Sequence, residues 1–513
     1  MKQLNKNNIF QSNEISRDLA QKSFRGGMST IASQGIQFFL STVAIVVLAR
    51  LLTPSEYGLV GMAMVVVAFA KMFMEAGLST ATVQKDSISH EQISTLFWIN
   101  LFIGLFLGLC VLASSPLVAR FYERSELSAI IAALSLTFFI NGLVIQHEAL
   151  LRRHMRFSTL AVISIAAEAM TLCVTLILAL FGWRYWAIVG GTITTAFTRS
   201  LGMFLFCRWI PGHMRKGTGV REMLKFGRNI TVANFFTYFS LNLDNILIGK
   251  FIGANALGIY SRAYRLFIMP VTQIRMPVTN VAIASLSALK EQPNRYIKYY
   301  QRLLNLMATV TIPLTVYCII EVDFIIRLLL GPQWLEVISV FRILAIAGII
   351  QPVAETLGIV LLSFGFSDKY LYYGMANTII KVIAIVAGLS FGIEGVASGY
   401  VVASYAIFIP SLFYCFHKTP ITVTLFLKTL IAPILTSVLT ASIVISVRSL
   451  NPNESLALHF VLLGLYMLIY AGVSCFRKSI RETIVMFLAN LSVTSRSKEA
   501  EQIDKILVKD AGI

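Results

Sequence analysis

Long apolar stretches dominate the sequence and restrict the chain to folds that place helices in a membrane. About 20 apolar residues in a helix cross the roughly 30 Å hydrocarbon core of a bilayer, whereas strands of a spanning barrel alternate in polarity over about ten residues. This criterion predicts an all-α polytopic membrane protein with about fourteen spanning helices. The expected spans are 27–49, 57–80, 95–119, 128–150, 159–181, 186–207, 229–252, 266–289, 303–330, 336–364, 370–391, 394–416, 424–447 and 458–476.

The composition excludes a soluble globular protein. Of the 513 residues, 57% are hydrophobic and 13% are charged, which leaves too little polar surface to cover a soluble domain of this size. Most Lys and Arg residues fall in loops expected on the same side of the membrane as the two chain ends, so the positive-inside rule places both ends in the cytoplasm. The net charge of +18 is therefore explained by topology and contact with anionic lipids, and nucleic-acid binding is not expected.

The expected spans fall into two lobes of about six helices each and a final pair. The predicted parts are a cytoplasmic or interfacial tail (1–26), an N-terminal lobe (27–210), a basic cytoplasmic linker (211–228), a C-terminal lobe (229–418), an extra helix pair (424–476) and a cytoplasmic tail (477–513).

A short repeat relates the two lobes. Residues 49–58 and 249–258 each place a cation, Arg50 or Lys250, where one apolar span ends, and a glycine, Gly58 or Gly258, where the next begins. The flanking apolar spans keep the same spacing. Duplicated halves are typical of membrane transporters whose substrate site lies between them, so we expect this motif at the rim of each lobe.

Charges inside the expected spans mark the candidate site, because each costs at least a few kcal/mol at the bilayer centre unless it faces water, a partner or a ligand. Several of the cations have no opposite charge one turn away, so their partners must come from other helices or from a ligand. Guanidinium groups suit phosphate in particular, since their fixed fork bonds two oxygens. The candidate substrate-binding cations are Lys71, Arg199, Arg275, Arg342 and Lys381.

Deep carboxylates are the candidates for ion coupling or for counterions. Lys71 and Glu75 are four residues apart on one helix, so a self-neutralising pair is an equally good interpretation of both. Asp244 could act as the counterion of a cation in the lumen between the lobes, carry a proton or help to hold a sodium ion. The counterion role is favoured. The full set is Glu75, Glu168, Asp244 and Glu355.

No pattern indicates a metal, a cofactor or a catalytic centre. The six cysteines occur singly in apolar spans, without a CxxC pair. His459 is the one histidine expected near the outer face, and the histidines are interpreted as interfacial. The sequence has no nucleophile–base pair, carboxylate dyad or phosphate-cradling glycine loop, so an enzyme is not expected.

The pattern formed by residues 48–58, 242–250, 257–260 and 263–266 resembles the polysaccharide synthase family of bacterial exporters, which contains the Wzx-type flippases. That family belongs to the multidrug/oligosaccharidyl-lipid/polysaccharide superfamily. The resemblance covers residues from about 25 to about 476 and implies two lobes arranged as a V, in the inner membrane of a bacterium, that open alternately to either side. It also implies an undecaprenyl-pyrophosphate-linked oligosaccharide as cargo, membrane lipids as neighbours, and a glycan polymerase and a chain-length regulator as partners.

Two other classes remain as alternatives. A small-molecule or multidrug antiporter of the same superfamily would share the fold, but we would expect an acidic or aromatic pocket for cations. A membrane polysaccharide polymerase or ligase would carry a long outward loop with candidate acid and base residues, and every expected outward loop here is short. The sequence therefore favours the flippase, with the sugar and the energy source left open.

Overall fold

The computed structural model describes residues 19–74, 79, 82–83, 85, 88–215, 238–239, 242–450 and 455–475. All regular structure within these residues is helical, which confirms the predicted all-α class. In this part of the chain nine helical segments are long and apolar enough to cross a membrane, or ten if one bent pair is counted. One of the nine, residues 367–416, contains two of the expected spans. Part of the expected span at 229–252, namely residues 229–237, 240 and 241, lies outside the described residues.

The chain divides into two compact units, unit 1 (residues 1–262, 326–337 and 389–396) and unit 2 (residues 263–325, 338–388 and 397–513). The helices of unit 1 are α1 (Leu19–Leu51), α2 (Pro54–Met74), α4 (His90–Tyr122), α5 (Glu126–Gly142), α6 (Ile145–Arg153), α7 (Phe157–Leu180), α8 (Trp186–Cys207) and the first part of α10 (Ala254–Ala288). Unit 2 contains the remainder of α10, the first half of α12 (Val322–Leu329), and most of α13 (Val337–Gly348) and α17 (Gly392–Phe416). It also contains all of α11 (Pro293–Ile320), α14 (Gln351–Ala354), α15 (Thr356–Ser363), α16 (Ser367–Gly388), α18 (Val423–Leu450) and α19 (Leu456–Cys475). Two short 3₁₀ turns, Pro332–Trp334 and Leu389–Phe391, complete the order.

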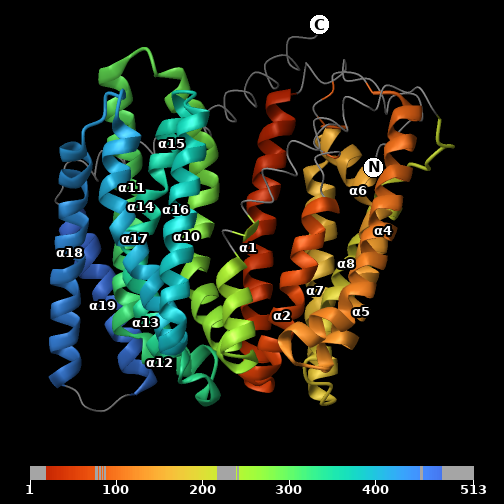
Figure 1. Cartoon of the computed structure of the whole chain (residues 1–513). Helices are drawn as coiled ribbons and strands as arrows, with labels where there is room; N and C mark the ends of the chain where they lie inside the picture. Colours follow the sequence, from red (N-terminus) through yellow and green to blue (C-terminus); the bar gives the residue numbers. More distant parts are fainter. Residues whose placement is uncertain are drawn as a thin grey trace, which may run out of the picture. The chain divides into compact units, whose positions relative to one another are not determined.

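In unit 1, small residues allow the helices to pack closely. Helix α7 packs against α8 and α1, and α4 packs against α5 (Figure 1). A Cβ atom on Gly104 of α4 would lie 2.7 Å from the backbone oxygen of Phe138 on α5, so only glycine permits this approach. These contacts bring α2, α5, α7 and α8 around the site described below.

In unit 2, buried tyrosines connect α11 to α15. The hydroxyls of Tyr296 and Tyr300 lie 2.7 Å from Ser363 Oγ and 2.9 Å from Thr356 Oγ1, respectively. Both tyrosines are fully buried, and a buried phenol needs such a partner. Helix α11 also packs against α18, and α18 packs against α19 (Figure 1).

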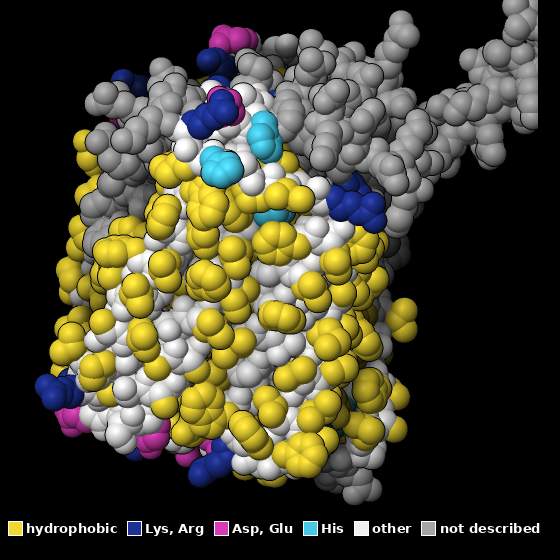
Figure 2. Space-filling model, turned by 90° about the vertical axis from the view of Figure 1, so that its right-hand side faces the viewer, with side chains coloured by type: hydrophobic (Ala, Val, Ile, Leu, Met, Phe, Trp, Pro, Cys, Tyr) yellow, Lys and Arg dark blue, Asp and Glu magenta, His cyan; other side chains and the backbone are white. Residues whose placement is uncertain are grey.

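The outer faces of the helices are apolar. On α4, Phe102, Phe106 and Leu117 expose 57%, 66% and 65% of their surface. Figure 2 shows one face of the molecule as a broad band of hydrophobic side chains, with charged residues gathered at its two ends. An exposed apolar band of this kind is stable against lipid and not against water, so the chain is a multi-pass membrane protein.

Several expected spans are interrupted, and charged residues lie near the interruptions. The span at 336–364 consists of α13, α14 and α15, and Pro352, which has no backbone N–H, lies in the first turn of α14. Helices α5 and α6 form a pair bent by 42°. Glu355 lies between α14 and α15, and Glu148 lies in α6 just after the bend.

Candidate functional site

A cavity of about 310 Å³, with charged and hydroxyl side chains set in a mostly apolar lining, lies among α1, α2, α5, α7 and α8 of unit 1. It brings together three of the predicted site residues, Lys71, Glu168 and Arg199. They come from α2, α7 and α8, so the cavity depends on how these helices pack. Asn141 and threonines of α5, α7 and α8 supply further polar groups.

Arg199 has a carboxylate partner on another helix. Its Nη2 atom donates to both carboxylate oxygens of Glu148 on α6, at 3.0 Å each. Glu148 also accepts hydrogen bonds of 2.7 and 3.1 Å from Arg152. Arg199 therefore shares the single negative charge of Glu148 with Arg152, and its own charge is compensated only in part.

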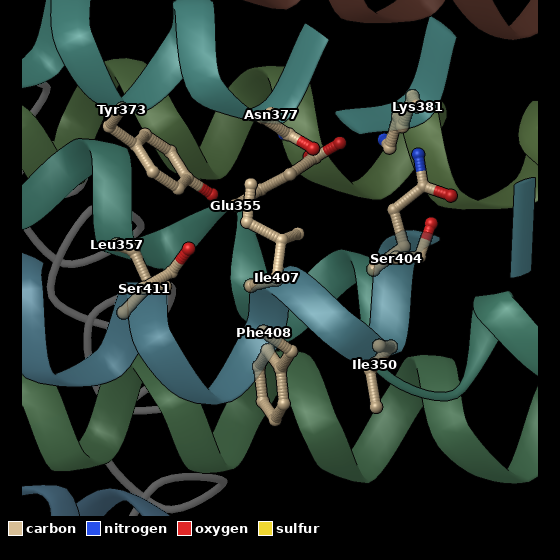
Figure 3. A pocket seen from close by; sticks show the side chains of 12 residues that line it. Ile350, Glu355, Leu357, Tyr373, Asn377, Lys381, Ser404, Ile407, Phe408 and Ser411 are labelled. Atoms are coloured by element: carbon tan, nitrogen blue, oxygen red, sulfur yellow. The ribbon is translucent and has the colours of Figure 1, made fainter. Parts of the chain in front are cut away.

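A second cavity, of about 90 Å³, lies in unit 2 and contains Glu355 and Lys381. Figure 3 shows Glu355 close to Asn377, with Tyr373 on one side and Lys381 on the other. Asn377 Oδ1 is buried without a hydrogen-bond partner, and such an oxygen costs about 1–3 kcal/mol if it is left unpaired. The cavity thus combines a cation, a carboxylate and an amide oxygen that can accept a hydrogen bond.

The cation of this cavity rests on an aromatic ring. Lys381 Nζ lies 4.8 Å from the ring centroid of Tyr400, and the Tyr400 hydroxyl donates to Gln351 Oε1 at 3.2 Å. Tyr264 packs edge-on against Tyr400, with centroids 5.9 Å apart and ring planes at 90°. Tyr264 therefore orients the ring on which the Lys381 ammonium lies.

Asp244 is 8% exposed in unit 1 and accepts two hydrogen bonds. The Tyr260 hydroxyl donates to its Oδ2 at 3.1 Å, and the backbone N–H of Asn245 donates to its Oδ1 at 2.8 Å. These bonds hold the carboxylate in a fixed position. Its role as counterion or coupling group stays a prediction.

The two copies of the rim motif meet within unit 1. A Cβ on Gly58 would lie 1.7 Å from the backbone oxygen of Ala254, and a Cβ on Gly258 would lie 1.9 Å from the backbone oxygen of Pro54. Pro54 and Ala254 are the first residues of α2 and α10, and each glycine lies four residues later. The crossing is reciprocal, as a two-fold pseudosymmetry requires.

The cations of the rim motif also have equivalent contacts. Arg50 Nη2 donates to the backbone oxygen of Leu328 at 2.7 Å, near the end of α12. Lys250 Nζ donates to Glu123 Oε1 at 2.7 Å, just after α4. Lys250 holds the pKa of the Glu123 carboxyl below its usual range, through the hydrogen bond and through its charge.

The other predicted site residues lie outside the two cavities or outside the described side chains. Arg342 on α13 pairs with Asp323 of α12 and is about half exposed. Arg275 lies on α10, but its side chain is outside the described set, as is Glu75 altogether. The roles predicted for these residues stay predictions.

Two features were missed by the sequence reasoning. Glu148 lies within the expected span 128–150, and a charged residue inside an apolar span could have identified it as a site residue. The second is a buried cluster in unit 2, in which His459 Nδ1 lies 2.6 Å from Glu321 Oε2 and Arg448 Nη1 lies 3.7 Å from Glu321 Oε1. The His459 side chain is buried in the protein: it is 5% exposed, and its ring stacks on Phe324 with centroids 4.0 Å apart.

Comparison with known proteins gives both relatives and structural neighbours. Residues 47–339 match the model of the family described as "Polysaccharide biosynthesis protein". The chain is similar to "Teichuronic acid biosynthesis protein TuaB" of Bacillus subtilis (strain 168), with 28% identity over 63% of this chain and 68% of that protein. It is also similar to "Lipopolysaccharide biosynthesis protein WzxC" of Escherichia coli (strain K12), with 24% identity over 74% of this chain and 78% of that protein.

Two solved structures share the fold. "Lipid II flippase MurJ, inward closed conformation" matches with a TM-score of 0.72 and 15% identity, over 88% of this chain and 98% of that one. A multidrug resistance MATE family transporter of the MOP superfamily, in its inward-facing conformation, matches with a TM-score of 0.59 and 15% identity, over 77% and 96%. The predicted fold class, that of the MOP-type transporters, is thereby confirmed.

Proposed function

Because the chain belongs to the polysaccharide biosynthesis protein family, we propose that it is a flippase for a lipid-linked oligosaccharide of a polysaccharide pathway. The cargo is an undecaprenyl-pyrophosphate-linked oligosaccharide, moved from the cytoplasmic to the periplasmic leaflet of a bacterial inner membrane by alternating access. The protein performs no covalent chemistry and needs no cofactor. Membrane lipids surround it, and a glycan polymerase and a chain-length regulator act on the delivered cargo.

The observation that carries this proposal is the presence, in each unit of a lipid-exposed helical protein, of a cavity that contains cationic and other polar side chains. A pyrophosphate cannot leave water cheaply unless cations and hydrogen-bond donors replace its hydration. Lys381 in unit 2 supplies such a cation, and Arg275 on α10 is the second candidate. Sugars are polar as well, so the cargo's head requires a polar cavity while its lipid tail stays in the bilayer.

The reciprocal crossing of α2 and α10 supports alternating access. Closing one end of a transporter requires a contact that forms and breaks as a unit. The Gly58 and Gly258 contacts involve few side-chain atoms, since each glycine faces a backbone oxygen. We propose that this rim closes in one state and opens in the other.

The test is a transport assay in reconstituted liposomes that follows the appearance of a fluorescent polyprenyl-pyrophosphate oligosaccharide in the outer leaflet. Wild type is compared with Lys381→Ala and Arg275→Ala, and with Lys369→Ala as the matched control. Lys369 is also on α16 and also lies over a ring, that of Phe366 at 4.8 Å, but it does not line the cavity. We expect transport to fall at least about tenfold in the first two variants and to stay unchanged in the control.

Imposing a membrane potential in the same transport assay provides a second test. A potential that is negative on the starting side favours outward movement of an anion by about 2.3 kcal/mol per charge per 100 mV. Normal transport by both Lys381→Ala and Arg275→Ala would contradict the cationic site. A folded wild-type protein that moves no lipid-linked sugar under any imposed gradient or potential would contradict the proposal and favour the small-molecule antiporter.

A further inference from the structure

A phosphate needs hydrogen-bond donors, whereas the threonines that line the unit 1 cavity offer mainly hydrogen-bond acceptors. Its volume of about 310 Å³ falls at the lower end of the range of about 300–1,000 Å³ that is usual for ligand pockets. Threonines line it on three helices: Thr137 on α5, Thr171 and Thr175 on α7, and Thr192 and Thr195 on α8.

The hydroxyl protons of four of these threonines, Thr137, Thr171, Thr192 and Thr195, are already engaged. Thr192 Oγ1 donates to the backbone oxygen of Ile188 at 2.9 Å, and Thr137 Oγ1 donates to that of Leu134 at 2.6 Å. A threonine has one hydroxyl proton and two lone pairs. Each of these side chains therefore offers only an acceptor to the cavity.

Thr171 and Thr195 form a pair with the same property. Their Oγ1 atoms are 2.6 Å apart, and each also lies within hydrogen-bond distance of a backbone oxygen one turn earlier, Ala167 at 2.7 Å and Gly191 at 2.9 Å. The two hydroxyls have two protons for these three contacts. Whichever arrangement holds, neither proton points to a ligand, and the pair again offers lone pairs.

Carboxylates also lie close to the cations of the cavity. Arg199 is bonded to both oxygens of Glu148, and Lys71 faces the same cavity as Glu168. Phosphate oxygens only accept hydrogen bonds, so a pyrophosphate could accept from Lys71 and from the Asn141 amide but would also meet threonine lone pairs and the Glu168 carboxylate. A sugar hydroxyl can donate to these acceptors and can accept from the Lys71 ammonium.

From this lining we infer that the unit 1 cavity binds the sugar of the cargo through its hydroxyls, and does not bind the pyrophosphate. The inference rests on the proposed function and assigns one part of the cargo to one cavity. Close packing fixes the acceptors in place, because a Cβ on Gly191 would lie 2.1 Å from Thr175 Oγ1. Pre-positioned acceptors lose little side-chain entropy when a ligand binds.

The test measures binding of two soluble probes to the full-length protein in detergent. The first is the free oligosaccharide released by mild acid from the lipid-linked pool of the source cells, and the second is inorganic pyrophosphate. The variant is Thr171→Val/Thr195→Val, which keeps the side-chain shape and removes two acceptors. Thr429→Val is the matched control, since Thr429 Oγ1 donates to the Leu425 backbone oxygen at 2.8 Å in α18, outside the cavity.

We expect the double valine variant to bind the oligosaccharide about tenfold more weakly and pyrophosphate as wild type does. Thr171→Ser/Thr195→Ser should restore sugar binding, because serine keeps the acceptor. If the double variant fails to fold, Thr192→Val serves in its place, with about a threefold loss expected. Unchanged sugar binding in folded valine variants, or loss of pyrophosphate binding instead, would overturn the inference.

Transport in liposomes separates this inference from the proposed function. Wild type that transports the lipid-linked oligosaccharide, together with a double valine variant that transports equally well, would refute the sugar site and leave the flippase intact. Wild type that binds the free oligosaccharide through these threonines but moves no lipid-linked sugar would refute the flippase and leave the sugar site intact.

Discussion

Gly58 and Gly258 are each packed against the first backbone carbonyl of the other's helix, so α2 and α10 cross where both begin. The sequence placed these two glycines at equivalent positions of a repeat, and the structure brings the repeats into direct contact. Nothing larger than a hydrogen atom fits at either Cα, since a Cβ atom would lie 1.7 or 1.9 Å from the facing backbone oxygen, far below van der Waals contact.

Gly58→Ala should therefore destabilise the protein. The added methyl would overlap the Ala254 backbone oxygen, and overpacking of this kind typically costs about 1–3 kcal/mol. The measurement is the apparent melting temperature in detergent, together with transport in liposomes. Gly61→Ala is the control on the same helix, because its Cβ would meet only a Leu257 side-chain atom at 3.4 Å. Equal melting temperatures for the two variants would show that α2 and α10 can move apart at this crossing without a loss of stability.

The buried Glu321–His459 pair should stabilise the attachment of the last two helices to unit 2. Glu321 and His459 are 0% and 5% exposed, and they connect the end of α11 with the start of α19. Removing one partner of a buried pair leaves an uncompensated polar group and costs about 3–5 kcal/mol. We expect Glu321→Gln and His459→Ala each to lower the melting temperature.

The double variant provides the check. Glu321→Gln/His459→Ala should cost clearly less than the sum of the single changes, as coupled residues do in a double-mutant cycle. Glu291→Gln is the control, since Glu291 and Lys290 form an exposed pair 3.9 Å apart that should contribute little. Strict additivity would mean that the two side chains act independently.

The sequence was sufficient to predict the helical membrane fold, because spans of about 20 apolar residues need no tertiary information. It also predicted the rim glycines, since a repeat is visible in one dimension. It could not predict that Arg199 pairs with Glu148, because uniformly apolar spans leave helix rotation undetermined. The same reason hid the partner of Arg342, which is Asp323 of α12. The threonines of the unit 1 cavity lie on three different helices, and no local pattern in the sequence marked them.

The contact between Glu123 and Lys250 should make stability depend on pH in the acid range. Lys250 lowers the pKa of Glu123 in the folded state, so the contact contributes stability above the unfolded pKa of about 4.3 and loses it as the pH falls through the lower folded pKa. Glu123→Gln should therefore have a lower melting temperature than wild type at pH 7, and this gap in melting temperature should close below about pH 4.

Salt offers an independent check on this ion pair. The pair is exposed on the Glu123 side, so raising the ionic strength at pH 7 should reduce the same gap. Glu126→Gln is a nearby control, since Glu126 lies in the first turn of α5 and has no ion pair with Lys250. A gap that widens on acidification would contradict the depressed pKa of Glu123.

The ring of Tyr400 should position Lys381 for the cargo. A cation over an aromatic face gains about 0.5–2 kcal/mol, so Tyr400→Leu should raise the apparent KM for the lipid-linked oligosaccharide by about 2- to 30-fold. Tyr400→Phe keeps the ring and loses only the 3.2 Å hydrogen bond to Gln351, so its KM should change by less than about threefold.

Two further variants decide whether Tyr400 acts through Lys381. Tyr400→Leu combined with Lys381→Ala should transport no worse than Lys381→Ala alone, because the ring has no cation left to hold. Tyr405→Leu is the control on the same helix, as the Tyr405 hydroxyl donates to the Ile346 backbone oxygen at 3.0 Å away from the cavity. If Tyr400→Leu lowers transport further in the Lys381→Ala background, the ring contacts the cargo itself and is not a positioning residue.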